Sequence, residues 1–98
     1  MTKTYYLTTP IYYVNAKPHI GHAYTSILCD TFARFHRLLG ESVFYITGTD
    51  EHGIKVQKAA LEQGKAPKAF VDAIVPEFKE LWRVLGIQYD HFIRTTDD

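Results

Sequence analysis

The stretch Thr9–His22 constrains the fold more than any other part of the chain. Before it, Thr4–Thr8 is short, aromatic and β-branched, which predicts a strand, and after it a long segment shows helical apolar spacing. Pro10 and Pro18 exclude regular structure across the connecting loop, and Pro18 suits the entry to a helix, where its missing N–H costs nothing. A strand, a loop and a helix N-terminus in this order form the geometry with which α/β folds bind phosphate groups.

An alternation of strand and helix patterns continues along the rest of the chain. We expect strands at Thr4–Thr8, Ser42–Thr47 and Tyr89–Thr95, and helices at His19–Leu39, Ile54–Gln63 and Pro67–Leu85. Pro76 lies inside the last helical pattern and should kink or divide it. The order predicts an α/β fold with about three parallel strands joined by right-handed crossover helices. We expect Thr4–Thr8 to be a buried parallel strand rather than an amphipathic edge.

Composition is typical of a small soluble protein. The 98 residues are 46% hydrophobic and 22% charged, and 11 basic residues balance 11 acidic ones, so no overall charge favours nucleic-acid binding. The one cysteine, Cys29, excludes an intrachain disulfide and fits a reducing compartment. The N-terminus has no apolar leader, and no apolar run approaches the roughly 20 residues that span a bilayer. We therefore expect a cytoplasmic chain without membrane contact.

Two histidines at the start of the first predicted helix are the leading candidates for chemistry. His19 and His22 share a face of its first turn, and Gly21 between them removes a side chain where a ligand could approach the backbone. The helix N-terminus adds unpaired N–H groups and partial positive charge, so an anion is the natural ligand. Two alternatives stay open: surface histidines that only cap the helix, and a metal pair completed by His52 or Asp50.

A second polar group follows the second predicted strand, in a turn expected at Gly48–Gly53. Its members Asp50, Glu51 and His52 include a carboxylate that could hold a substrate ammonium group, although an Asp here could equally be the N-cap of the next helix. The loop residues Tyr12 and Tyr13 suit an aromatic-lined pocket, but one of them is expected to be only a loop anchor. Parallel strands place both groups in one crevice at their carboxyl ends.

Cys29 and Asp30 lie in the middle of the first predicted helix. Its apolar neighbours make Cys29 a packing residue rather than a nucleophile. Asp30 should be paired if it is buried, because an unpaired buried carboxylate is costly. Both are therefore interpreted as structural.

With these residues identified, the chain resembles the N-terminal catalytic part of the methionyl-tRNA synthetases, a family of class I aminoacyl-tRNA synthetases. His19-Ile20-Gly21-His22 matches the class I signature as it is usually written. Flanking segments that look like the methionine-specific branch are Thr9–Asn15 and Thr47–Gly53, and the similarity continues at Pro67–Asp72, Leu85–Asp90 and Phe92–Thr96. The resemblance covers nearly the whole chain.

The resemblance implies a role for each motif residue. His19 and His22 would contact the ATP phosphates and stabilise the transition state, and Gly21 would let adenine and ribose approach the backbone. Asp50 would receive the amino group of L-methionine, and Ile11 and Tyr13 would line the amino-acid pocket. The methionine carboxylate would attack the α-phosphate of ATP, supplied with Mg²⁺, and the methionyl group would then pass to tRNA(Met). The protein's share would be positioning and charge stabilisation.

Three parts of that family are absent from this sequence: the lysine-rich second signature, the connective insertion with its zinc site, and the anticodon-binding domain. The family's connective insertion would begin near Asp98, so residues 1–98 correspond to the N-terminal half of a Rossmann-like catalytic domain. We expect little or no aminoacylation by this chain alone. A half domain would leave Thr4–Thr8 as an unpaired edge and one sheet face uncovered, which favours self-association or contact with a missing C-terminal segment.

Two other functions remain as alternatives at this stage. A small nucleotidyltransferase could share the His-x-Gly-His site, although the Gly48–Gly53 turn and the tyrosine loop argue against it. A nucleotide-binding fragment without turnover would keep the phosphate contacts and lack the opposing wall of the crevice. Binding of a methionyl-adenylate analogue distinguishes the synthetase and fragment interpretations from the transferase.

Overall fold

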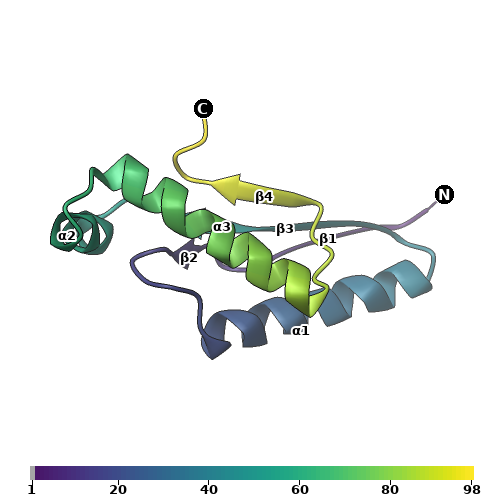
Figure 1. Ribbon diagram of the computed structural model, residues 1–98. Helices are drawn as coiled ribbons and strands as arrows, with labels where there is room; N and C mark the ends of the chain where they lie inside the picture. Colours follow the sequence, from purple (N-terminus) through teal and green to yellow (C-terminus); the bar gives the residue numbers. More distant parts are fainter. Residues whose placement is uncertain (1) are drawn as a thin grey trace.

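In the computed structural model, which describes residues 2–98, four parallel strands form one sheet that three helices accompany (Figure 1). The predicted α/β fold with parallel strands is confirmed. The elements are β1 (Thr4–Thr8), β2 (Tyr12–Tyr13), α1 (Ile20–Leu38), β3 (Ser42–Asp50), α2 (Ile54–Glu62), α3 (Pro67–Leu85) and β4 (His91–Arg94). None of the helices in this described part is both long and apolar enough to cross a membrane.

Strand β3 is the centre of the sheet. It pairs with β1 along its first half and with the short β2 at Thr49 and Asp50. Strand β4 pairs with the second half of β3, and Ile46 has both Thr8 and His91 as partners, so β4 lies on the opposite side from β1. The carboxyl ends of β2, β3 and β4 therefore meet at one edge, where open parallel sheets bind ligands.

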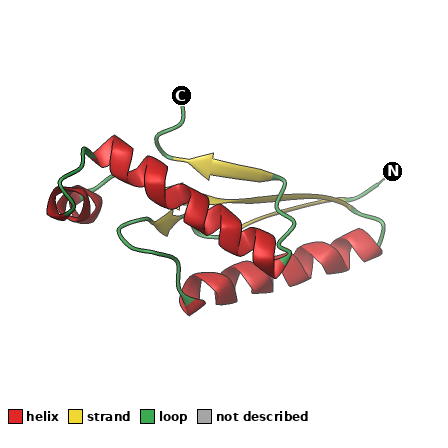
Figure 2. Ribbon diagram, viewed as in Figure 1, coloured by secondary structure: helices red, strands yellow, loops and turns green. Residues whose placement is uncertain are grey.

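Helices α1 and α3 cover one face of this sheet, and α2 lies beyond the N-terminal end of α3 (Figure 2). Side chains alternate along β3, so Tyr45 and Thr47 are buried beneath the helices while Phe44 is exposed on the other face. Trp82 and Phe78 of α3 complete the core and are fully buried. The expected uncovered sheet face is confirmed, because apolar side chains remain exposed on it.

The first helix has its predicted length but packs with the opposite face. Its buried residues are Ser26, Asp30 and Ala33, which are small or polar. Its large apolar residues point away from the sheet: Ile20 is 87% exposed, Phe35 54% and Leu38 88%. The apolar spacing that predicts the helix therefore does not identify the face that packs on the sheet, where small residues allow close approach. We call the exposed set Ile20, Tyr24, Ile27, Leu28, Phe32, Phe35 and Leu38 the outer face of α1.

The prediction that Thr4–Thr8 is a buried strand is wrong, whereas the expectation of an unpaired edge is confirmed. Within residues 2–98, strand β1 pairs only with β3, and it alternates between exposed and half-buried residues. Tyr5 and Leu7 face the helices, and Tyr6 on the open face is 60% exposed. Aromatic content indicates a strand but does not indicate that both its faces are covered.

Several elements differ in extent from the prediction, among them β4, which is expected at Tyr89–Thr95 and spans His91–Arg94. Tyr12–Tyr13 forms strand β2 within the loop, where the two residues pair with Thr49 and Asp50 of β3. Strand β3 continues through Gly48 to Asp50, so the predicted turn begins only at Glu51. Helix α3 is undivided at Pro76, because Ile74 before it and Phe78 after it are both anchored in the core.

Candidate functional site

Helix α1 begins with a capping box made by its two histidines. The Gly21 N–H donates to His19 Nδ1 at 3.0 Å, and the His19 N–H donates to His22 Nδ1 at 3.0 Å. The two rings stack with their centroids 3.9 Å apart. A ring nitrogen that accepts carries no proton, so each neutral imidazole has its N–H at Nε2. Both histidines therefore cap the helix, and this role leaves both Nε2–H groups as donors for an anion.

The cap also explains the glycine in the motif. A Cβ built on Gly21 would lie 2.9 Å from Cε1 and 3.1 Å from Nδ1 of the His19 ring. A side chain there would push the ring away from its capping position. The structure thus gives Gly21 a local role, which is independent of any ligand that approaches the backbone.

His22 is held more firmly than His19. Its ring lies against Tyr12, with centroids 4.9 Å apart, and against Phe78 at 5.1 Å. Burial lowers the pKa of the His22 ring below its ordinary value of 6.5, and the neighbouring His19 ring lowers it further. Near neutral pH the ring is therefore neutral, as its capping hydrogen bond requires.

This pKa predicts a loss of stability in mild acid. Below pH 6.5 the unfolded chain protonates His22 before the folded chain does, so the free energy of unfolding falls as the pH drops from 6.5 through the lower folded pKa. Urea unfolding between about pH 7.5 and 5 would measure the effect. His22→Asn keeps an acceptor for the cap without titrating and should have a shallower pH dependence. Equal slopes for the two proteins would contradict the prediction.

The second group contains one available carboxylate and one occupied carboxylate. Asp50 is half-buried beside Tyr13 at the end of β3, and its carboxylate has no hydrogen-bond or ion-pair partner among residues 2–98. The Glu51 side chain is fully buried and pairs with Arg94. The N-cap of α2 is Gly53 without a side-chain cap, so the alternative that Asp50 caps this helix is wrong. Of these two carboxylates, Asp50 is the one without a partner among the described residues and could receive a cation.

Hydrogen bonds explain the difference between the two acids. Burial alone would raise the pKa of the Glu51 carboxyl, but hydrogen bonds from Arg94, Thr49 and Thr96 outweigh burial and hold that pKa below its ordinary value. The same pairing raises the pKa of the Arg94 guanidinium. Sequence reasoning assigned Arg94 no role, because its partner lies 43 residues away along the chain.

Strand β2 brings the two groups together. Tyr12 pairs with Thr49, is buried, and shares a 3.0 Å hydrogen bond with the Ser26 hydroxyl of α1. It is the loop anchor that the sequence predicts. Tyr13 pairs with Asp50 and is 52% exposed on the open face, and Ile11 is also exposed. The His22 ring and the Asp50 backbone thus flank the same tyrosine pair.

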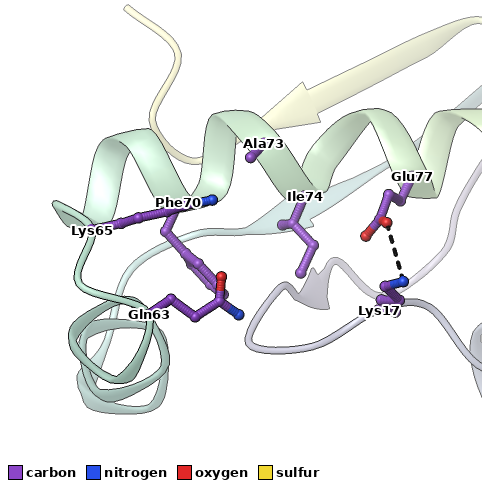
Figure 3. Close-up of a pocket in the computed structure, with 7 residues that line it drawn as sticks. All are labelled: Lys17, Gln63, Lys65, Phe70, Ala73, Ile74 and Glu77. Carbon is purple, nitrogen blue, oxygen red and sulfur yellow. Dashed lines mark ion pairs between the residues drawn. The ribbon is translucent and has the colours of Figure 1, made fainter.

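Two surface cavities border this region. One of about 400 Å³ is lined by Tyr13 with Gly53, Ile54 and Lys55 at the start of α2. The other, of about 200 Å³, lies between α3 and the loop before α1, where Lys17 and Glu77 form an ion pair at 3.8 Å (Figure 3). The first cavity is lined by Tyr13, the partner of Asp50 on β3, which makes it the better candidate for an amino-acid side chain.

Cys29 and Asp30, in the middle of α1, have the structural roles that the sequence predicts. Cys29 packs against the core, and burial raises the pKa of its thiol, which disfavours the reactive thiolate. Asp30 is paired, as predicted: its carboxylate accepts from Arg34 Nε at 2.6 Å and from the Gln88 N–H at 2.8 Å. Within residues 2–98 no three histidine, cysteine or acidic side chains gather into a group that could hold a metal ion.

Comparison with known proteins shows that this chain is similar to tRNA synthetases of class I. The family model described as tRNA synthetases class I (M) matches residues 5–98. The methionine–tRNA ligase of Caldanaerobacter subterraneus is 58% identical over 97 residues, which are 99% of this chain and 15% of that protein. The methionine–tRNA ligase of a Nostoc species is 62% identical over 94 residues, 96% of this chain and 18% of that protein.

Solved structures show the same architecture. Mycobacterium tuberculosis methionyl-tRNA synthetase in complex with methionyl-adenylate has a TM-score of 0.96 and 48% identity, covering 98% of this chain and 19% of that one. A ternary complex of an Agrobacterium radiobacter LeuRS with tRNA and LeuAMS has a TM-score of 0.92 and 28% identity, covering 98% and 13%. This chain therefore spans less than a fifth of the length of these proteins.

Proposed function

Because the chain belongs to the class I tRNA synthetase family described as tRNA synthetases class I (M), we propose that it is the ATP- and methionine-binding segment of a methionine–tRNA ligase. The observation that carries the proposal is the 48% identity and TM-score of 0.96 to a methionyl-tRNA synthetase that holds methionyl-adenylate. The identity of 58% and 62% to two methionine–tRNA ligases supports it, and does not favour a small nucleotidyltransferase.

The site geometry suits adenylate formation. Both histidines present Nε2–H donors at the positive end of α1, where they would bind the ATP phosphates and stabilise charge in the transition state. Asp50, with its free carboxylate, would accept the methionine ammonium group by charge-assisted hydrogen bonds. Ile11 and Tyr13 would line the amino-acid side of the site.

The reaction follows from these contacts. The methionine carboxylate attacks the α-phosphorus of ATP, a new C–O–P linkage forms, and pyrophosphate leaves with the electron pair of the broken P–O bond. The chain's residues hold the two reactants and meet the developing negative charge. Mg²⁺ would enter bound to the ATP phosphates, its usual ligands in such sites. The tRNA(Met) acceptor end would then take the methionyl group.

We also propose that residues 1–98 are the N-terminal half of a Rossmann-like catalytic domain, in a cytoplasmic protein. The uncovered sheet face and the outer face of α1 support this proposal, because both expose apolar side chains that a complete domain would bury. A C-terminal segment or a second copy of the chain would cover them. The zinc site of the family would lie outside these residues.

These 98 residues alone are expected to have very weak or no activity, because they span less than a fifth of the length of the ligases they resemble. Methionine-dependent ATP–pyrophosphate exchange measures it, and a rate near that of a complete synthetase would overturn the expectation. Calorimetry with ATP, methionine and a methionyl-adenylate analogue tests the proposed function itself. Binding of the analogue without turnover supports it, and binding of ATP with no response to methionine would count against it.

A further inference from the structure

The carboxylate of Glu51 has every acceptor position used. Arg94 donates to it through two parallel bonds, Nε to Oε2 and Nη2 to Oε1, both 2.8 Å long. The Thr49 hydroxyl donates to Oε2 at 2.6 Å, and the Thr96 hydroxyl donates to Oε1 at 2.8 Å. The side chain has no exposed surface. A buried carboxylate with four donors and a two-pronged guanidinium is rigidly held in one geometry.

The same network ties together three segments at the carboxyl edge of the sheet. The Glu51 N–H donates to Thr95 Oγ1 at 2.8 Å, and the Thr95 N–H donates to the Thr49 carbonyl at 3.2 Å. Arg94 Nη2 also donates to Asp72 of α3 at 2.6 Å. His52 lies 3.2 Å from the Thr95 carbonyl through Nε2. The residues on both sides of Asp50 are thus fixed to β4 and its C-terminal extension.

Unlike the Glu51 carboxylate, the Asp50 carboxylate is not held by hydrogen bonds from other side chains in the described part of the chain. Its carboxylate has no partner of its own within residues 2–98, so only the backbone and the adjacent residues set its direction. Thr49 before it and Glu51 after it both belong to the network. Side chains on adjacent strand residues point to opposite faces, so the buried Thr49, whose hydroxyl donates to Glu51, leaves Asp50 on the outward face beside Tyr13.

We propose that Glu51 is a positioning residue: through its ion pair with Arg94 it aims the Asp50 carboxylate at the ammonium group of the amino-acid substrate. This inference rests on the proposed function for the identity of the ligand, and on the geometry alone for the restraint of the turn. Each half has its own measurement.

Hydrogen–deuterium exchange of the free chain tests the restraint. In Glu51→Gln, exchange in the peptide spanning residues 49–54 should accelerate about tenfold, while the middle of α1 is unchanged. Arg94→Lys keeps the positive charge but loses the two-pronged geometry, so exchange in residues 49–54 should accelerate in this variant too. The matched control is Glu80→Gln, which breaks the exposed Glu80–Arg83 pair and should leave residues 49–54 unaffected. Unchanged protection in Glu51→Gln, or equal acceleration across the chain, would overturn the proposal.

Two adenylate analogues test the substrate half, one with the methionine α-amino group and one without it. Methionylsulfamoyl adenosine should bind the parent chain about tenfold or more tightly than its desamino counterpart, since a charge-assisted hydrogen bond is lost. Glu51→Gln should abolish most of that preference and leave the affinity for the desamino compound unchanged. Thr96→Val removes one donor and should give an intermediate preference, which provides a second variant if the first unfolds.

The outcomes separate the two proposals. If the parent chain binds neither analogue, the proposed function fails for this chain, and the exchange measurement still decides the restraint. If the parent binds both compounds and Glu51→Gln keeps the full preference for the amino compound, the positioning role is overturned while the function stands. If Glu51→Gln loses affinity equally for both compounds, Glu51 only stabilises the fold. That result also overturns the positioning role.

Discussion

Replacing Trp82 with alanine is expected to cost about 3–5 kcal/mol of folding stability, the usual range for an aromatic side chain removed from a core. Trp82 is fully buried and packs edge-on against Tyr12 and Phe78, so it joins α3 to β2 and supports the two rings that contact His22. The total free energy of unfolding of a natural domain is only about 5–15 kcal/mol. Urea unfolding followed by circular dichroism measures the loss.

The control for this prediction is Trp82→Phe. The buried indole Nε1 has no hydrogen-bond partner in the described structure, so phenylalanine removes an unsatisfied donor while keeping an aromatic ring in place. Its loss of stability should be clearly smaller than that of the alanine variant. Similar losses for the two variants would mean that the ring's packing contributes little, contrary to the prediction.

Gly48→Ala is expected to destabilise the sheet by about 3 kcal/mol or more, the upper end of overpacking effects. A Cβ at this position would lie 2.0 Å from the Ile93 carbonyl oxygen and 2.6 Å from Ile93 Cγ2. Backbone cannot move aside as a flexible side chain can, so β4 would separate from β3. Urea unfolding gives the magnitude, and hydrogen exchange in residues 91–95 gives the location.

Ser42→Ala is the matched control, because Ser42 lies on the same strand and the same face as Gly48 and is exposed. Its effect should stay within about 0.5 kcal/mol, as for most surface substitutions. If the Gly48→Ala variant unfolds at the same urea concentration as the parent, β4 is not held against β3 in solution.

The sequence predicts the elements well where a local cause fixes them. Helix α3 ends before Gly86, whose φ of 70° lies in the left-handed region that glycine adopts most readily. The sequence also predicts that His19 and His22 share the first turn of α1, because they lie three residues apart, and the structure places them there. The prediction that Gly48 begins a turn is wrong, because a glycine within a strand can also mark a close backbone approach, here that of Ile93.

Features that depend on distant residues could not be predicted. Periodicity shows that α1 has an apolar face but not whether the sheet or something else covers it, and here Ser26 and Ala33 meet the sheet. Likewise Glu51 and Asp50 are adjacent acids in the sequence. Only the fold, by bringing Arg94 beside one of them, makes the first a buried ion-pair member and leaves the second free.

The outer face of α1 has a consequence for every stability measurement on this chain. A helix whose large apolar residues face water lowers its free energy whenever a second apolar surface covers them. Any such association stabilises the folded form by mass action, so the unfolding midpoint will rise with protein concentration. The thermodynamic stability of these 98 residues is thus a function of dilution as well as of sequence.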